Sequence, residues 1–228
     1  MHKNFVLAKN KLKKFKQISS YSHVFEPTIE VLNSEYQYKG KWKSEVFKNN
    51  NPIILELGCG KGEYSVALAE KYPQKNFIGV DIKGARIWKG ATDSLSKKLT
   101  NISFLRVRIE WIEHCFDNDE IDEIWITFPD PQLKFRRSSK RLTHPNFLKK
   151  YNKILNNSGV IHLKTDNNFL HAYTLGILDG QSHSIEYSSN DIYNSEHLYE
   201  HLEIKTYYEQ KYLEKGMPIT YIKFRLNY

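Results

Sequence analysis

The sequence predicts an α/β fold in which helices cover both faces of a mostly parallel, seven-stranded sheet. Strand-like and helix-like segments alternate from residue 51 onward, with no internal repeat, long linker or low-complexity segment. The first strand-like run, Ile53–Leu57, is aliphatic except for Glu56 near its carboxyl end, which is typical of a strand buried on both faces of a parallel sheet. The chain has 228 residues, of which 40 % are hydrophobic, and this suffices for one sizeable core.

Short apolar or β-branched runs mark the expected strands. They cover Ile53–Leu57, Phe77–Asp81, Ile102–Arg106, Glu123–Phe128, Val160–Thr165, Ser184–Tyr187 and Ile219–Leu226. Segments with roughly amphipathic spacing between them are long enough for crossover helices. These helices are expected at Glu63–Lys71, Gly84–Lys97, Ile109–Cys115, His144–Leu155 and Asn168–Asp179. We therefore expect one doubly wound domain over residues 51–228, preceded by a basic extension, residues 1–50, that packs on or flanks the core.

A glycine-rich turn, E-L-G-C-G-K-G, follows the first strand. Gly58, Gly60 and Gly62 let the backbone turn tightly and approach a ligand closely. Asp81 ends the second strand, nineteen residues after Gly62, and is placed to accept hydrogen bonds from two ribose hydroxyls. The pattern indicates a cofactor that contains a nucleoside.

Three kinds of site compete for this turn. Dinucleotide sites space their last two glycines three apart so that a helix amino end faces a pyrophosphate, whereas the spacing here is two. Glu56 would repel a pyrophosphate but would hold a cationic amino acid group. S-adenosyl-L-methionine combines a ribose with an ammonium and a sulfonium, so we favour it over a dinucleotide or a purely structural turn. Its expected ligands are Glu56, Gly58, Gly60 and Asp81.

Composition limits the remaining classes of function. No run approaches the about 20 apolar residues that cross a bilayer, and the amino terminus lacks an apolar signal core. We therefore expect a cytoplasmic protein without membrane contact. Cys59 and Cys115 have no spacing typical of a metal site or a disulfide, and the nine histidines show no metal pattern. No bound metal is expected.

Positive charge is clustered along the chain. Thirty-four Lys and Arg against 26 Asp and Glu give a formal net charge of +8. One cluster near the amino terminus is either a solubilising tail or a phosphate-binding surface, and it contains Lys9, Lys11, Lys13, Lys14 and Lys16. The other follows a predicted strand end, where open parallel sheets bind ligands, so we expect it to contact phosphates. It contains Lys134, Arg136, Arg137, Lys140 and Arg141.

The fourth predicted strand ends in T-F-P-D-P. Pro129 and Pro131 each fix φ near −65° and restrict the residue before them, so Asp130 is confined on both sides. It should project at the same sheet edge as the cofactor. An ordinary proline turn is the alternative interpretation.

Four motifs in this order resemble the bacterial single-chain tRNA (guanine-N7-)-methyltransferases. They are E-L-G-C-G-K-G, F-P-D-P with its basic loop, L-K-T-D and T-Y-Y-E, and they span most of the chain. The resemblance implies a Rossmann-like class I methyltransferase that transfers a methyl group from S-adenosyl-L-methionine to N7 of the variable-loop guanosine of tRNA. It also implies a monomer or homodimer without an obligate protein partner.

The resemblance assigns roles to particular residues. Glu56 and Asp81 would bind the cofactor, and Asp130 would be the acid at the reaction site. The residues that would contact the substrate are Lys134, Asp166, Thr206, Tyr208 and Glu209. Gln132 stands where the family usually has tryptophan, Arg108 where it has an acid near the adenine, and Tyr207 where it has a basic residue. These departures indicate a divergent branch.

The expected reaction depends mainly on how the enzyme positions the reacting atoms. Guanine N7 already carries a lone pair, so no base has to remove a proton, and alignment of the reacting atoms dominates. Asp130 would stabilise the positive charge that grows on the base, or accept hydrogen bonds from its N1 and N2 edge. Two other hypotheses are a methyltransferase with a small-molecule or protein acceptor, and an RNA-binding protein with a degenerate fold. The basic loop argues against the first, and the presence of Glu56, Asp81 and Asp130 argues against the second.

Overall fold

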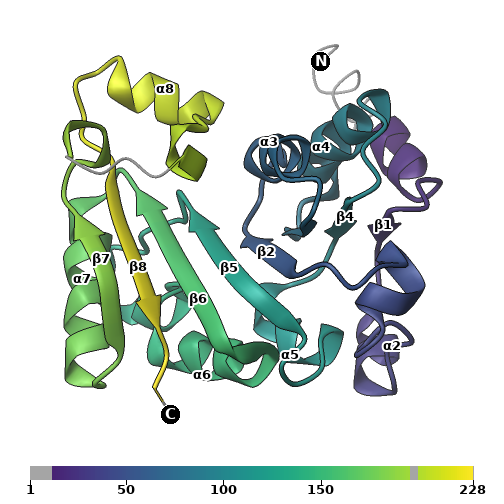
Figure 1. Ribbon diagram of the computed structural model, residues 1–228, viewed down its shortest axis with the longest axis horizontal. Helices are drawn as coiled ribbons and strands as arrows, with labels where there is room; N and C mark the ends of the chain where they lie inside the picture. Colours follow the sequence, from purple (N-terminus) through teal and green to yellow (C-terminus); the bar gives the residue numbers. More distant parts are fainter. Residues whose placement is uncertain (1–11, 196–199, 228) are drawn as a thin grey trace.

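The fold is seen in a computed structural model of the chain, which describes residues 12–195 and 200–227 (Figure 1). Its eight strands form one sheet in the order β1-β4-β3-β2-β5-β6-β8-β7. They are β1 (Val24–Phe25), β2 (Ile53–Leu57), β3 (Asn76–Val80), β4 (Ile102–Leu105), β5 (Ile121–Thr127), β6 (Leu155–Thr165), β7 (Ser184–Ser189) and β8 (Thr220–Arg225). Neighbours from β1 to β6 pair in parallel, and β8 pairs antiparallel with both β6 and β7.

Helices connect the strands. The longer ones are α3 (Glu63–Lys71), α4 (Gly84–Ser96), α6 (Pro145–Ile154), α7 (Asn168–Gly180) and α8 (Tyr207–Leu213). The shorter ones are α2 (Ile29–Asn33), α5 (Ile112–Cys115), the π-helical η1 (Trp42–Phe47) and the 3₁₀ turns η2 (Ile109–Trp111), η3 (Phe135–Lys140), η4 (Ile192–Asn194) and η5 (Glu200–Glu203). Residues 12–18 are also helical.

The central strands of the sheet are buried on both faces. In β2, Ile53 and Leu55 belong to one buried apolar cluster and Ile54 to the other, because successive side chains of a strand point to opposite faces. Helices α2, α5, α6 and α7 contribute to the first cluster, while α3 and α4 contribute to the second. The predicted α/β architecture is thus confirmed.

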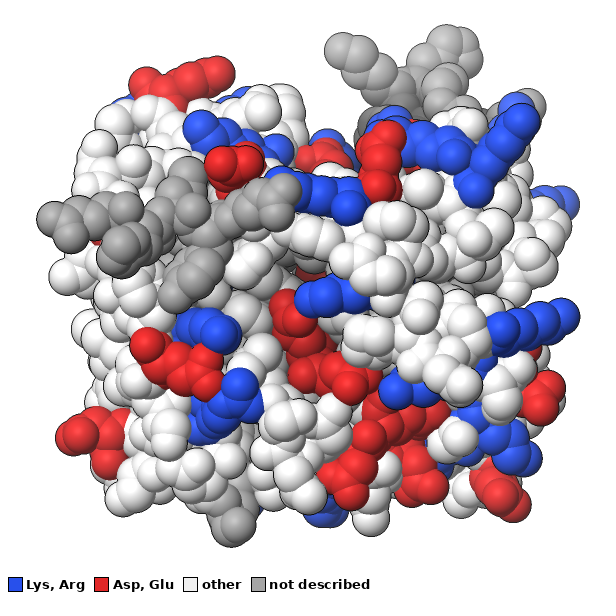
Figure 2. All heavy atoms as spheres, viewed as in Figure 1, with Lys and Arg blue, Asp and Glu red and all other residues white. Residues whose placement is uncertain are grey.

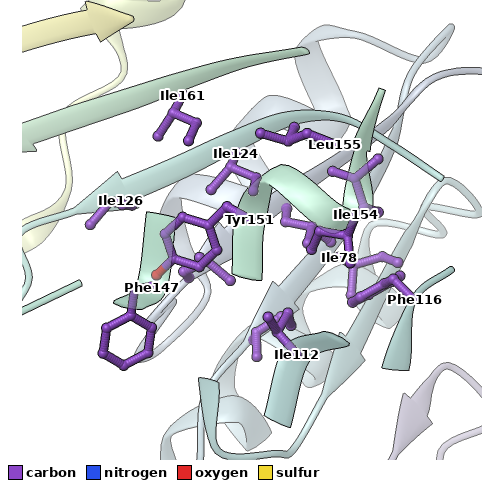
Figure 3. Packing of buried hydrophobic residues seen from close by; sticks show 14 of the residues in the cluster. Ile78, Ile112, Phe116, Ile124, Ile126, Phe147, Tyr151, Ile154, Leu155 and Ile161 are labelled. Carbon is purple, nitrogen blue, oxygen red and sulfur yellow. The ribbon is translucent and has the colours of Figure 1, made fainter. Parts of the chain in front are cut away.

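Figure 3 shows part of the first apolar cluster, to which helix α6 contributes on one face of the sheet. Tyr151 and Ile154 of α6 belong to the same apolar cluster as Ile124 of β5 and Ile161 of β6, and all four side chains are buried. Fully burying an aliphatic side chain stabilises a fold by about 1.5 to 3 kcal/mol. This packing fixes β5, whose carboxyl end borders the candidate site.

The prediction of seven strands is wrong by one. β1 contains only two residues and pairs with the edge of β4, so it carries no periodic signal in the sequence. The segment between β1 and β2 places four apolar or aromatic side chains in the buried core, namely Leu32, Tyr36, Trp42 and Phe47. Helix α8 was likewise not predicted, because its seven residues, Y-Y-E-Q-K-Y-L, have no clear apolar face. The other boundaries differ from the prediction by a few residues.

The strand order places a crevice between β2 and β5. From β2 the chain crosses to β3 on one side, whereas β5 lies on the other side, and ligands of open parallel sheets bind at such a switch point. Both strands end at the same edge, because Glu56 is in register with Trp125 and Leu57 with Ile126. In Figure 1 the carboxyl end of β5 lies at the upper edge of the sheet, below α8.

Candidate active site

Glu56 lies at the centre of the crevice and is only 4 % exposed. Its Oε2 accepts hydrogen bonds from the Ser65 amide at 3.0 Å and from the Ser65 hydroxyl. Its Oε1 accepts one from the Thr127 hydroxyl at 2.6 Å. Ser65 comes from α3 and Thr127 from β5, so three elements fix this carboxyl group. The sequence predicts neither donor, since Ser65 has no sequence signal and Thr127 is only the first residue of T-F-P-D-P.

Burial raises the pKa of Glu56 to about 7, and the neighbouring charge of Asp81 acts in the same direction. The hydrogen bonds from Ser65 and Thr127 oppose this rise. A cation placed beside the carboxyl group would favour its ionised form. The site is therefore suited to a ligand that carries a positive charge.

The glycine turn leaves room next to this carboxyl group. Gly58 has a φ of 78°, and a Cβ at this position would meet no atom within 4 Å. Gly62 has a φ of 70°, and a Cβ there would lie 2.6 Å from the ring of Phe104, so only glycine fits without rearrangement. Asp81 is held by the Gly60 amide, 3.0 Å from its Oδ2, and by the Lys83 amide, 2.7 Å from its Oδ1. These residues fit a nucleoside that carries a cationic amino acid group.

The segment after β5 presents Asp130 to solvent. Phe128 and Gln132 have φ values of 48° and 47°, in the left-handed region that residues other than glycine rarely adopt. The Phe128 amide donates to the Lys164 carbonyl at 2.8 Å, and the Gln132 amide donates to Asp130 Oδ1 at 3.0 Å. This turn, residues 128–132, therefore holds the acid in one orientation at the sheet edge.

Two adjoining cavities bring most of the predicted residues together, and both are lined by Gly58, Arg86 and Phe128. The first is also lined by Glu56, Gly60, Thr127, Thr206 and Tyr208. The second has a volume of about 510 Å³ and is also lined by Asp81, Arg108, Glu110, Asp130 and Gln132. Ligand cavities commonly enclose about 300 to 1,000 Å³. The cofactor acids and Asp130 thus line two cavities that share Gly58, Arg86 and Phe128.

Comparison with known proteins identifies the family. A family model described as "Putative methyltransferase" matches residues 50–222. A protein of Christiangramia forsetii named tRNA (guanine-N(7)-)-methyltransferase is 51 % identical over 221 residues, which are 96 % of this chain and 99 % of that protein. A protein of Bacteroides fragilis with the same name is 51 % identical over 96 % of this chain and 87 % of its own. The chain belongs to the tRNA (guanine-N7-)-methyltransferase family.

A solved structure supports the fold assignment. The 16S rRNA methyltransferase KamB superposes with a TM-score of 0.62 and covers 81 % of this chain and 92 % of its own, at 11 % sequence identity. Identity this low supports the fold alone. The Rossmann-like methyltransferase fold expected for this family is therefore confirmed.

Three of the predicted substrate residues of this family member lie outside the linings of both cavities. Lys134 is exposed just before η3, and Asp166 is half-buried after β6, where burial raises its pKa. Glu209 is fully buried and forms an ion pair with Lys164 of β6, which is also fully buried, at 2.7 Å. Lys164 further donates to the carbonyls of Leu202 and Ile204. The lysine of L-K-T-D was not predicted to have this role.

Glu209 also helps to cap the amino end of α8. The Thr206 hydroxyl accepts from the Glu209 amide, and the Glu209 carboxylate accepts from the Thr206 amide, which together form a capping box. The Tyr207 amide donates to Glu63 of α3 at 2.9 Å, so α8 is joined to the helix that follows the glycine turn. Through these bonds, Thr206 and Tyr208 reach the first cavity while Glu209 stays in the core.

Arg141 corrects one prediction about the basic loop. It is only 4 % exposed, and it donates to the carbonyls of Pro131 at 3.2 Å and Gln132 at 3.0 Å. Its guanidinium lies 4.8 Å and 4.3 Å from the ring centres of Phe169 and Tyr173 on α7. The expectation that Arg141 contacts phosphate is wrong, because these interactions leave it no access to RNA. The four other basic residues of this cluster are exposed.

The amino-terminal cluster is described only in part. Lys9 and Lys11 lie outside the described residues. Lys14 places its ammonium 4.4 Å from the ring centre of Trp88 on α4. Figure 2 shows Lys and Arg side chains along the upper edge of the molecule, the edge at which α3, α4 and residues 12–18 appear in Figure 1. Within residues 12–195 and 200–227, no helix is long and apolar enough to span a membrane, and no group of three or more metal-ligating side chains is found.

Proposed function

We propose that this protein transfers a methyl group from S-adenosyl-L-methionine to N7 of the variable-loop guanosine of tRNA. Family membership over nearly the whole chain supports the reaction and its substrate. The observation that carries the proposal is the meeting of Glu56, Asp81 and Asp130 around adjoining cavities at one sheet edge. S-adenosyl-L-methionine supplies an electrophilic methyl group on a sulfonium.

The chain's own residues bind and orient the methyl donor. Glu56 faces the ammonium of the donor's amino acid part, and Asp81 accepts hydrogen bonds from the ribose hydroxyls. Gly58 and Gly60 allow the backbone to approach the ligand. The Arg108 and Glu110 side chains line the second cavity, where the adenine would be bound.

Asp130 acts on the guanine. Alignment of N7 with the methyl carbon at near-attack distance contributes on the order of 7 to 11 kcal/mol to such a reaction. The methylated base becomes cationic, so an ionised Asp130 at the sheet edge stabilises the charge that develops. The left-handed residues on either side hold it in place before the substrate arrives.

The substrate surface surrounds this acid. Lys134, Arg136, Arg137 and Lys140 follow the tRNA phosphates. Thr206, Tyr208 and Asp166 contact the substrate from the opposite rim, and Glu209 supports them from within α8. We further propose that the protein acts in the cytoplasm, as a monomer or homodimer, without a membrane or an obligate protein partner.

The test compares the wild-type chain with Asp130→Asn. Each is incubated with labelled S-adenosyl-L-methionine and an unmodified tRNA transcript, and N7-methylguanosine is measured by nucleoside mass spectrometry. We expect Asp130→Asn to bind the methyl donor within about twofold of wild type and to lose about 100-fold or more in methyl transfer. Asp179→Asn, an exposed acid at the far end of α7, is the matched control and should retain full activity. Undiminished turnover by Asp130→Asn would refute the assigned role.

A further inference from the structure

The loop between Asp130 and α6 exposes an unusual aromatic side chain. Phe135 is 91 % exposed, which is the largest exposed fraction of any large hydrophobic residue in the described part of the chain. Leu133, two residues earlier, is 63 % exposed. Leaving an aromatic ring in water forgoes the free energy of its burial, so a ring held in this way is typical of a binding surface.

The neighbours of Phe135 are cationic. Lys134, Arg136 and Arg137 are all exposed, and none of them forms an ion pair with a carboxylate of a described residue. Elsewhere, Lys150 and Lys153 share Glu113 at 3.2 Å and 3.6 Å. The unpaired charge around the ring is complementary to a polyanion.

The loop is held rigidly at its base. η3 begins at Phe135, and the Arg137 amide donates to the Lys134 carbonyl at 2.9 Å. At the other end of η3, the Arg141 amide donates to the Ser138 carbonyl at 3.1 Å, while the Arg141 side chain bonds the turn that carries Asp130. A ring presented on such a support loses little conformational entropy when it binds.

The ring lies close to the reaction site along the chain. Gln132 and Lys140, on either side of Phe135, both line the cavity that contains Asp130. Phe135 follows Asp130 by five positions in the chain, so their Cα atoms are at most about 18 Å apart. An RNA strand whose guanine enters this cavity therefore has bases within reach of the ring.

We propose that Phe135 stacks on an unpaired base of the tRNA, near the guanosine that is methylated. The inference rests on the proposed function, because it takes the RNA that this function requires as the ligand. An enzyme that takes a base out of its stack leaves a neighbouring base face uncovered. A flat aromatic ring covers such a face whatever the base, while the cations on either side bind the adjacent phosphates.

The experiment measures dissociation constants for an unmodified tRNA transcript at several salt concentrations. Phe135→Ala should weaken binding by about 5- to 150-fold, the range found when an aromatic stacking partner is removed. Phe135→Leu keeps apolar area without a flat ring and should lose a similar factor, whereas Phe135→Trp should stay within about threefold of wild type. Leu133→Ala, an exposed apolar control on the same loop, should change binding less than twofold. Since Phe135 packs against almost nothing, all variants should fold.

Salt dependence separates stacking from charge. Phe135→Ala removes no charge, so the slope of log affinity against log salt should equal that of wild type. Arg136→Gln should lower the magnitude of this slope by about 0.7 to 0.9. Wild-type affinity in Phe135→Ala, or retained affinity in Phe135→Leu, would overturn the proposal, and the first result would point to a protein partner for this loop instead.

A failure of the stacking proposal can be distinguished from a failure of the proposed function. If the wild-type chain forms N7-methylguanosine and Phe135→Ala binds tRNA equally well, only the stacking role is wrong. If the wild-type chain forms no N7-methylguanosine, and Phe135→Ala binds tRNA more weakly than the wild-type chain does, the stacking role holds and the reaction assignment fails.

Discussion

At the scale of single residues, Glu56 combines deep burial with hydrogen bonds to two neighbouring elements. Burial raises its pKa to about 7 from an ordinary value of 4.5. Between these values the folded chain keeps a proton that the unfolded chain has lost. The group therefore favours folding fully below about pH 4.5, and this contribution is lost as the pH rises through about 7.

The direction of this pH dependence gives a prediction for Glu56→Gln. This substitution keeps the shape of the side chain but does not titrate. The free energy of unfolding of wild type should fall relative to that of the variant as the pH rises from about 5 to 7, by at most about 1.4 kcal/mol per pH unit. Urea unfolding at each pH measures both values. Parallel curves for the two chains over this range would show that the pKa of Glu56 is not raised.

Sequence reasoning placed the proposed cofactor and reaction-site acids better than the residues that support them. Glu56, Asp81 and Asp130 stand in short motifs whose geometry follows from glycine and proline, so their meeting at one edge was predicted and is observed. Arg141 belongs to a run of cations, and composition cannot distinguish a buried clamp from a phosphate ligand. Only the position of α7, about 30 residues further along the chain, decides between these roles.

At the scale of elements, β6 and α8 are joined by the buried pair of Lys164 and Glu209. Removing one partner of such a pair leaves an uncompensated charge in the core, which typically costs about 3 to 5 kcal/mol. Lys164→Met and Glu209→Gln should therefore each destabilise the chain strongly. The double variant should be clearly more stable than the sum of the two single losses predicts. Denaturant unfolding of the four chains tests this, and strict additivity would contradict the coupling.

There is a physical reason why some helices and strands could be predicted from the sequence and others could not. Strands β2 to β4 are largely apolar because both faces are covered, and the carboxyl-terminal parts of β5 and β6 are buried in the same way, so these runs are visible in the sequence. β1 has two residues, and α8 is short and is stabilised largely by a capping box and a buried ion pair. A contact distant in sequence determines β1, so no local pattern revealed it. The start of α8 does carry a local signature, the T-x-x-E of its capping box, and only its buried ion pair depends on a distant residue.

At the scale of the whole molecule, the methyl donor should stabilise the fold, because its proposed ligands come from several elements of the sheet edge. At a ligand concentration 100 times the dissociation constant, the stabilisation is about 2.7 kcal/mol. For a chain of this size that corresponds to a rise in Tm of about 5 to 10 °C. Thermal unfolding with S-adenosyl-L-methionine should show this shift in wild type and in Asp130→Asn, and little shift in Asp81→Ala. An equal shift in Asp81→Ala would exclude the cofactor role of that residue.

The position of β8 has a consequence for how the protein is made. β8 lies between β6 and β7 although it follows both in the chain, and about 30 residues separate the end of β7 from its start. A ribosome adding about 5 to 20 residues per second needs about 1.5 to 6 s to deliver them. During that delay, β7 has no partner and β6 has an open edge, the state in which strands most readily pair with other chains. The side of the sheet that carries Lys164 and Asp166 therefore closes last, and a nascent chain interrupted before β8 never completes this side of the sheet.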